Sequence, residues 1–251
     1  MGTILSVVNQ KGGVGKTTTA VNLTAALTLA GKRVLLCDFD PQANATSGLG
    51  VNKEQVKAST YDIIINGADP LSAVVHTKYG DVLPSSPALS GAGIELVGVA
   101  DREHQLRTAL AKLRSRYDYL FVDCPPSLEL LTLNALCAAD RIFIPVQCEY
   151  YALEGLRDLM TTLRAVKRRL NPTLDIFGVL LTMFDGRTNL SMQVAEEVRR
   201  FFPGKVFSTV IPRNVRLSEA PSHGLPIFGY DKFSRGAESY QALAAEVIRK
   251  E

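Results

Sequence analysis

The residues with the clearest chemistry are lysines, glycines and threonines near the start of the chain. The run Lys11-Gly-Gly-Val-Gly-Lys-Thr-Thr18 follows an apolar stretch and precedes a segment with helical spacing. Glycines let backbone N–H groups turn inward around phosphate oxygens, and the N-terminus of the next helix adds partial positive charge. The pattern therefore predicts a site for a nucleoside triphosphate. The residues expected to bind it are Lys11, Gly12, Gly13, Val14, Gly15, Lys16, Thr17 and Thr18.

The side chains of this loop have separate expected roles. We expect Lys16 to reach the β- and γ-phosphates, the Thr17 hydroxyl to bind Mg²⁺, and Thr18 to donate to the α-phosphate. The usual phosphate-loop pattern has glycine at the position of Gln10, whereas here a second lysine opens the loop. Lys11 either supplies positive charge where charge develops in the reaction or is a solvated surface lysine, and its position favours the first.

Two acidic sites complete the expected chemistry. Asp123 ends the apolar run that begins at Tyr119, and at that strand end we expect it to hold Mg²⁺ through a coordinated water. Asp38 and Asp40 end another apolar run and precede Pro41. We expect Asp40 to orient and polarise the attacking water, and Asp38 to support the metal and the lysines. The alternative is that these residues only form a strand-ending turn.

Short apolar runs alternate with longer segments of helical spacing along the chain. The runs are almost continuously apolar, which is typical of strands covered on both faces. The pattern predicts an α/β fold with a doubly wound, mainly parallel sheet, in a single domain over 1–251. The expected strands are Thr3–Val8, Arg33–Phe39, Tyr119–Cys124, Arg141–Val146, Ile176–Thr182 and Val206–Ile211. The expected helices are Thr17–Ala30, Arg102–Ser115, Leu128–Ala138, Leu153–Leu170, Ser191–Phe202 and Glu238–Arg249. Residues 43–100 are the least regular and are expected to form loops.

Composition and charge narrow the class of protein. Hydrophobic residues make up 46% of the chain and charged residues 21%, with a net charge of +3. Residues 151–251 carry 15 Lys and Arg against 11 Asp and Glu, which hints at an anionic partner on that half. The four cysteines lack the spacing of a disulfide framework or a zinc site. Without a signal-peptide or membrane-span pattern, we expect a cytoplasmic protein.

Three later runs, together with the loop, resemble a known family. They are Asp40-Pro-Gln-Ala-Asn-Ala-Thr-Ser-Gly-Leu-Gly50, Pro145-Val-Gln-Cys-Glu-Tyr-Tyr-Ala-Leu-Glu-Gly155 and Val210-Ile-Pro-Arg-Asn-Val-Arg-Leu-Ser-Glu-Ala-Pro221. The chain resembles the ParA/MinD group of P-loop NTPases with a deviant Walker A motif (the SIMIBI type). It is most similar to the chromosomal ParA/Soj members, from end to end. One departure is Ala43, where the resemblance leads us to expect glycine.

The resemblance implies an ATP-driven cycle. ATP and Mg²⁺ bring two subunits into a homodimer, in which Lys11 reaches the phosphates bound by the other subunit. The dimer binds double-stranded DNA without sequence preference, and a ParB/Spo0J-type partner stimulates hydrolysis and release. Pro212 and Asn214 are then expected to contact the adenine, and Arg187 and Arg216 to bind DNA. Further cations that could supplement them are Lys205, Arg213, Lys232 and Arg235. The implied location is the nucleoid, and the implied role is chromosome segregation or replication control.

Three other functions are compatible with parts of this pattern. A MinD-like membrane ATPase would need an amphipathic tail, and we expect none because the chain stops at Arg249-Lys-Glu251, after the last predicted helix. An iron–sulfur reductase would need cysteines in exposed loops, whereas Cys124 and Cys148 lie at strand ends. A metabolic ligase or kinase would need a pocket for an acceptor, and no run in the sequence indicates one.

Overall fold

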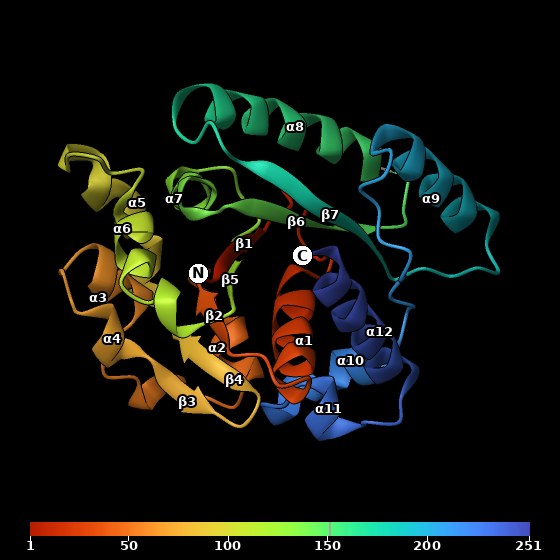
Figure 1. Ribbon diagram of the computed structural model, residues 1–251, viewed down its shortest axis with the longest axis horizontal. Coiled ribbons are helices and arrows are strands. Elements are labelled where there is room, and N and C mark those ends of the chain that lie inside the picture. Colours follow the sequence, from red (N-terminus) through yellow and green to blue (C-terminus); the bar gives the residue numbers. More distant parts are fainter. Residues whose placement is uncertain (151) are drawn as a thin grey trace.

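The computed structural model describes residues 1–150 and 152–251, and over these residues the strands form one seven-stranded sheet (Figure 1). Its order is β3-β4-β2-β5-β1-β6-β7, and every pairing is parallel except β3 with β4. The strands are β1 Thr3–Val7, β2 Val34–Asp38, β3 Val75–Thr77, β4 Gly80–Leu83, β5 Tyr119–Asp123, β6 Arg141–Gln147 and β7 Asp175–Thr182. The predicted doubly wound parallel sheet is confirmed.

Helices cover both faces of the sheet. They are α1 Lys16–Leu29, α2 Asn44–Gly48, α3 Thr60–Ile64, α4 Pro70–Ala73, α5 Ala92–Glu95, α6 Gln105–Ala111, α7 Leu130–Ala138, α8 Ala152–Arg169, α9 Asn189–Phe201, α10 Val215–Glu219, α11 Ile227–Tyr230 and α12 Arg235–Lys250. In Figure 1, α7, α8 and α9 lie on one side, and α1 and α12 on the other. The predicted helices are therefore present, although the one expected over Arg102–Ser115 is shortened to α6 and a following 3₁₀ turn.

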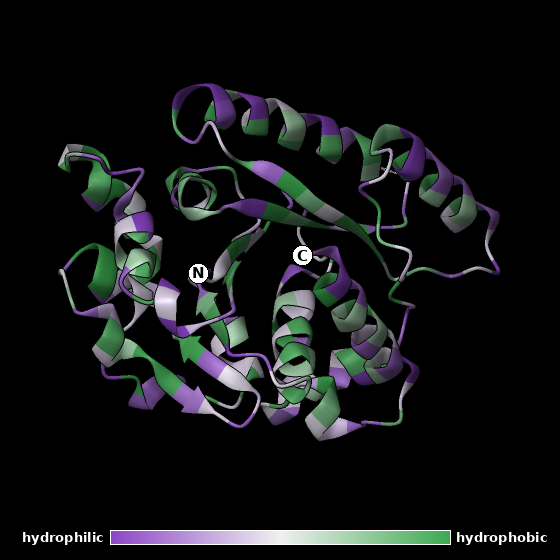
Figure 2. Cartoon of the chain, in the orientation of Figure 1, coloured by the Kyte–Doolittle hydropathy of each residue, from purple (hydrophilic) through white to green (hydrophobic). Residues whose placement is uncertain are grey.

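Each central strand contributes to two hydrophobic cores. In β2, Leu35 packs in the core under α7 and α8, and its neighbour Leu36 packs in the core under α1 and α12. Both side chains are fully buried, which explains why the strand sequences are apolar throughout rather than alternating. Figure 2 shows the same division, with hydrophobic colour on the strands and the inward faces of α8 and α9.

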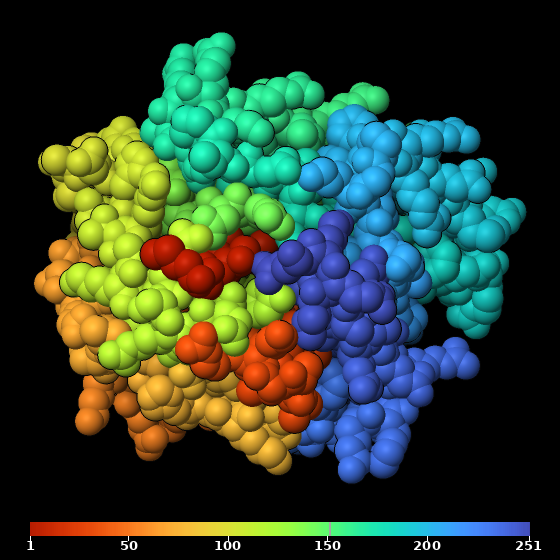
Figure 3. Space-filling view, in the orientation of Figure 1, coloured from red at the N-terminus to blue at the C-terminus, as the bar shows by residue number. Residues whose placement is uncertain are grey.

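The two chain ends lie near each other on the molecule. Met1 and Gly2 line one hollow together with Glu251, which follows α12. Figure 3 shows the red N-terminal residues beside the blue residues of the C-terminal helix. Since β1 begins here and runs toward the glycine-rich loop at its other end, both ends of the chain lie away from the expected nucleotide site.

Two expectations about strands were wrong. Residues 43–100 were expected to be loops, but they contain the hairpin of β3 and β4 and several short helices. The strands of this hairpin have only three and four residues. Polar residues such as His76 and Asp81 interrupt its apolar ones, so the hairpin lacks the continuous apolar run by which the other strands were recognised.

The second error is the predicted strand Val206–Ile211. This segment lies along β7, to which Phe207 donates a backbone hydrogen bond of 2.9 Å, but it forms one isolated bridge, between Val206 and Val179, instead of a regular strand. The N–H groups of Ser208 and Thr209 donate to the carboxylate of Glu246 on α12, at 2.8 and 3.0 Å. The side chain of Glu246 therefore takes the Thr209 N–H, which a continuous strand would offer to β7.

We predict that Gly178→Ala destabilises the fold. A Cβ built at Gly178 would lie 2.6 Å from Cζ of Phe207, a fully buried ring that stacks on Phe143 at 4.9 Å. Overpacking of this kind costs about 1–3 kcal/mol, so the midpoint of thermal unfolding should fall by several degrees. Gly93→Ala is the matched control, because its Cβ would have no described atom within 4 Å, and it should unfold like the parent protein.

Candidate nucleotide-binding site

The glycine-rich loop connects β1 to α1 at the carboxyl edge of the sheet. Gly13 and Gly15 have φ angles of 74° and 86°, in the left-handed region that glycine adopts without strain. Gly15 is the N-cap of α1, and Lys16 is its first residue. The loop thus has the strand, turn and helix N-terminus that a phosphate cradle requires.

Lys16 lies inside this loop. Its side chain is almost completely buried, and Nζ donates a hydrogen bond of 3.0 Å to the backbone carbonyl of Lys11. Burial lowers the pKa of the Lys16 ammonium, and the nearby carboxylates of Asp123 and Asp40 partly offset this. Because a cation in this position is poorly solvated, its attraction to a phosphate would be little screened by water and therefore strong.

Two carboxylates lie side by side next to Lys16. Asp38 and Asp123 occupy paired positions at the ends of β2 and β5, and both are fully buried. Burial, followed by repulsion from Asp38, raises the pKa of Asp123 well above its usual value. The Thr17 hydroxyl partly offsets this rise, although among the described residues neither carboxylate oxygen of Asp123 has a hydrogen-bond partner of normal geometry.

A buried carboxylate without a partner fits a divalent cation or one of its waters. The described residues contain no group of three or more His, Cys, Asp or Glu side chains that could hold a metal alone. Mg²⁺ at phosphate sites commonly takes one or two protein ligands, with phosphates and waters supplying the others. Thr17 and Asp123, which the sequence analysis expected to hold Mg²⁺, have chemistry and positions that suit this role.

Asp40 lies at the edge of the same site. It is 9% exposed, its N–H donates to Oδ1 of Asp38 at 3.2 Å, and its own Oδ1 accepts from the N–H of Gln42 at 2.9 Å. Its charge is close enough to Lys16 to affect the pKa of that lysine. The structure therefore brings Asp40 together with Lys16 and Asp123, as a water-orienting residue would require.

Lys11 has a different environment from Lys16. Its Nζ lies 3.3 Å from Oε2 of Glu149, which comes from the segment after β6, and the Lys11 side chain is 35% exposed. The side chain of Arg213 approaches the same glutamate at 4.0 Å. The Lys11 ammonium is thus paired with an exposed acid, whereas its backbone carbonyl faces Lys16.

A cavity of about 440 Å³ adjoins the loop. Gly15 of the loop and Thr18 of α1 line it on one side, and Pro212 and Asn214 line it from the segment before α10. Its volume and partly apolar lining suit a flat heteroaromatic ring. The positions that the family resemblance assigned to the adenine therefore converge on a cavity next to the phosphate loop.

The sequence analysis did not find the residues that hold the loop in place. The Thr182 hydroxyl at the end of β7 donates to the carbonyl of Val14 at 2.8 Å. Asn9 donates to the carbonyl of Pro145 at 2.7 Å and accepts from the N–H of Lys11 at 3.0 Å. Both are buried polar residues at the carboxyl end of an apolar run, which is the one signal that marks them.

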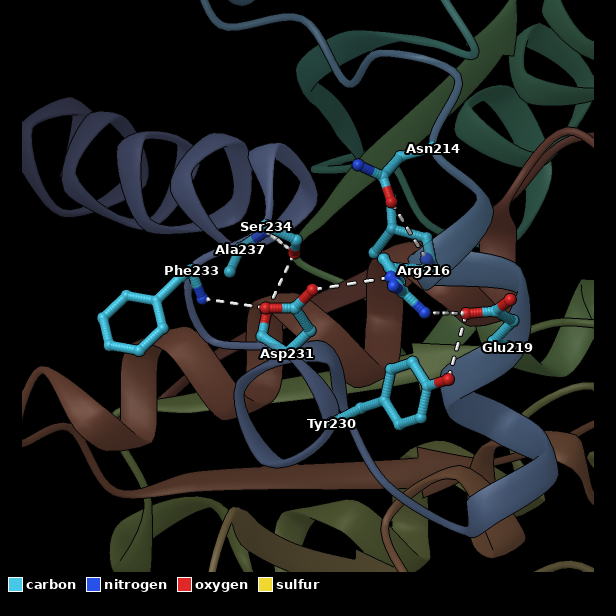
Figure 4. A network of polar contacts seen from close by, with 9 residues as sticks. Asn214, Arg216, Glu219, Tyr230, Asp231, Phe233, Ser234 and Ala237 are labelled. Carbon is cyan, nitrogen blue, oxygen red and sulfur yellow. Dashed lines mark hydrogen bonds and ion pairs between the residues drawn. The ribbon is translucent and has the colours of Figure 1, made fainter.

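The two arginines expected to bind DNA are exposed and already paired. Arg187 forms two hydrogen bonds with Asp185, at 2.9 and 2.8 Å, and its side chain is 89% exposed. Arg216 lies 2.9 Å from a carboxylate oxygen of Glu219 and 3.6 Å from one of Asp231. Figure 4 shows this network, in which the Tyr230 hydroxyl also donates to Glu219 at 3.0 Å.

The loop, the buried acids and the sheet together define a P-loop NTPase. Residues 2–176 match the family model described as an AAA domain. The chain is 59% identical to the sporulation initiation inhibitor protein Soj of Bacillus subtilis, over 98% of both chains. It is 52% identical to the chromosome partitioning protein ParA of Myxococcus xanthus, over all of this chain and 89% of that one.

A solved structure agrees with these matches. It is described as cobyrinic acid a,c-diamide synthase from Mycobacterium smegmatis with a bound ATP analogue and magnesium. It superposes with a TM-score of 0.89 at 37% identity, covering 99% of this chain and 95% of that one. The chain belongs to the ParA/Soj family of chromosome-partitioning ATPases. In the family run from Pro145 to Gly155, Tyr151 lies outside the described residues.

We predict that the two lysines of the loop differ in nucleotide binding. Lys16→Ala should weaken ATP binding at least about 100-fold, or about 3 kcal/mol, because the phosphates lose a desolvated ammonium. Lys11→Ala is the matched control from the same loop and should leave the affinity within about threefold, since its ammonium is paired with Glu149. Calorimetric titration of dilute protein measures both constants, and normal affinity in Lys16→Ala would contradict the assignment.

Proposed function

We infer that this protein is a DNA-partitioning switch driven by ATP. In this proposal it binds ATP with Mg²⁺, two subunits join across the bound triphosphates, and the dimer binds double-stranded DNA without sequence preference. A ParB/Spo0J-type partner then stimulates hydrolysis, and the dimer releases DNA. The observation that carries the proposal is the pair of lysines in one loop. One is buried at the phosphate site, and the other has its charge at the surface.

The residues of the site have complementary roles in the proposed hydrolysis. The N–H groups of the loop and Lys16 bind the phosphates, and Asp40 orients the attacking water. Lys11, leaving Glu149, provides a second positive charge to the triphosphate of the other subunit, where negative charge develops in the transition state. Thr17 and, through a water, Asp123 would hold Mg²⁺, which when bound would supply positive charge to offset that of the phosphates.

DNA binding is assigned to Arg187 and Arg216. Both are exposed, and guanidinium groups bind phosphate oxygens strongly without reading the bases. Each arginine is also paired with acids in the single subunit, so one subunit should bind DNA weakly. Two subunits in a rigid dimer present four such arginines and gain from effective concentration. This supports association with the nucleoid in the ATP-bound state.

The alternative of a MinD-like membrane ATPase has less support. The described part of the chain contains no helix that is long and apolar enough to cross a membrane. The last helix, α12, buries Tyr240, Leu243 and Val247 in the protein core, so its apolar face is not free to enter a lipid surface. Sedimentation with anionic liposomes would separate the two functions, because the DNA-binding protein should stay in the supernatant.

The other two alternatives are also disfavoured. Cys37, Cys124, Cys137 and Cys148 are free and buried, and a cluster shared between subunits needs exposed cysteines at the contact. For the metabolic ligase, the structure described as a synthase is 37% identical to this chain, whereas Soj is 59% identical. The stronger likeness supports partitioning over ligation.

We predict that Gly12→Val binds ATP but remains monomeric. A Cβ at Gly12 would meet nothing described nearer than Cβ of Pro126 at 4.0 Å, so a side chain can start from this position within one subunit, and we expect valine to obstruct a partner docked over the loop. Analytical ultracentrifugation with a non-hydrolysable ATP analogue tests this. The parent protein should sediment as a dimer and the variant as a monomer with near-normal nucleotide affinity.

The same measurement tests the proposed function as a whole. If the parent protein, saturated with the analogue, sediments as a monomer, the proposed switch is wrong. If Gly12→Val forms the dimer as well as the parent protein, the loop does not lie at the subunit contact. In either case the assignment of the phosphate cradle is judged separately by the affinity of Lys16→Ala.

We predict that Arg187→Ala and Arg216→Ala each weaken DNA binding without changing ATP affinity. Each removes a phosphate contact from both subunits, so the slope of log affinity against log salt should become shallower by about 1 to 2. Arg200→Ala is a matched control, because Arg200 is also exposed and paired with a nearby acid, at 2.7 Å. Fluorescence anisotropy with a labelled duplex measures the slopes, and equal slopes in all three variants would refute the assignment.

A further inference from the structure

Thr46 occupies a central position between the buried acids and the loop that carries Asp40. It lies on the short helix α2 and is fully buried. Both its N–H and its hydroxyl donate to Oδ2 of Asp38, each at 2.7 Å. Asp38 Oδ1 accepts from the N–H of Asp40 at 3.2 Å. One carboxylate therefore holds both ends of the segment from Asp40 to Thr46.

The hydroxyl of Thr46 has a fixed hydrogen-bond direction. The N–H of Ser85, in the segment after β4, donates to Thr46 Oγ1 at 3.0 Å. A backbone N–H can only donate, so Oγ1 is the acceptor in that bond and its own hydrogen is available to Asp38. The hydroxyl thus joins Asp38 to a second loop, and a side chain without a hydroxyl at position 46 would lose both of its bonds.

The segment between Asp40 and Thr46 contains a residue in an unfavourable backbone conformation. Ala43, within it, has φ 51° and ψ 38°, a left-handed conformation that is unfavourable for alanine. Its side chain is buried, and its N–H donates to the carbonyl of Asp40 at 2.9 Å. A strained residue keeps its conformation where surrounding contacts impose it, and the two bonds from Thr46 to Asp38 fix the C-terminal end of this segment.

We propose that Thr46 is a positioning residue for ATP hydrolysis, which holds the loop that carries Asp40 through its paired hydrogen bonds to Asp38. The inference rests on the proposed role of Asp40 as the residue that orients the attacking water. A displacement of about 1 Å in such a group can reduce turnover by up to about 100-fold. Thr46 lines neither the phosphate loop nor the ring cavity, so its effect falls on the chemical step and leaves ATP binding intact.

The test compares three substitutions in the full chain. Thr46→Val keeps the branched shape and the N–H but lacks the hydroxyl, and Thr46→Ser keeps the hydroxyl. Thr60→Val is the control, since the buried Thr60 hydroxyl donates to the backbone carbonyl of Asp38 at 3.0 Å but does not contact the segment that carries Asp40. Steady-state hydrolysis of ATP with Mg²⁺ gives kcat and KM, binding of a fluorescent ATP analogue gives Kd, and thermal unfolding gives Tm.

Thr46→Val should lower kcat by about 10-fold or more and change KM and Kd by less than about threefold. Thr46→Ser should restore kcat to within about threefold of the parent protein. Thr60→Val should lower Tm and leave kcat unchanged. If Thr46→Val does not fold, Thr46→Ala carries the same expectation for kcat.

The same substitution made in the Asp40→Ala protein tests the role of Thr46 separately from the proposed role of Asp40. In Asp40→Ala, adding Thr46→Val should cause no further loss, because the residue being positioned is already absent. A further loss there, an unchanged kcat in Thr46→Val alone, or an equal loss in Thr60→Val would each overturn the role of Thr46. Normal turnover in Asp40→Ala alone would instead remove Asp40 from the mechanism, and the inference with it.

Discussion

The arrangement of the site depends on the register between β2 and β5. That register sets Asp38 beside Asp123, two acids whose side chains are fully buried. Such a pair is unfavourable unless donors or cations compensate the charge. Asp38 is compensated by donors from its own loop, whereas among the described residues Asp123 has no hydrogen-bond partner of normal geometry. Asp38 therefore holds its own loop in place, whereas Asp123 would be available to a cation.

Lys16 places a positive charge close to these two acids, and its burial is unfavourable as well. Lys16 is buried at the head of α1, and its ammonium donates a hydrogen bond to the backbone carbonyl of Lys11. A triphosphate with Mg²⁺ would satisfy the lysine and the acid together, because it brings negative charge to one and positive charge to the other. Part of the free energy of nucleotide binding would thus come from compensating charges whose burial destabilises the folded protein.

Much of this site could be predicted from the sequence, because its signals are local. The glycines, Lys16 and Thr17 adjoin one strand and one helix, and each acid ends an apolar run. The contacts that hold the site could not be predicted in this way. Thr182 meets Val14 across 168 positions of sequence, and Thr46 sits in a segment that has no apolar periodicity.

The same limit explains the errors in the fold. The residues from Val206 to Ile211 have the composition of a strand, but Glu246, on the final helix, binds two of their N–H groups. The hairpin of β3 and β4 was missed because its residues are mixed in polarity, and a neighbouring strand, β2, stabilises it. In both places, tertiary contacts overrode the local pattern. Ala43 is the opposite case, since the glycine expected there is the residue that its backbone angles favour.

The prior pairing of Arg187 and Arg216 has a consequence for how long the protein would stay on a chromosome. If these arginines bind DNA as proposed, contact with a phosphate would exchange one anion for another at each of them, so the net attraction per contact would be small. With many weak contacts of this kind, the protein would dissociate from DNA rapidly when only a few are formed and slowly when all are formed. The residence time on DNA would then increase much more steeply than the number of joined subunits. Where ATP is locally lost, the protein would leave that stretch of DNA abruptly.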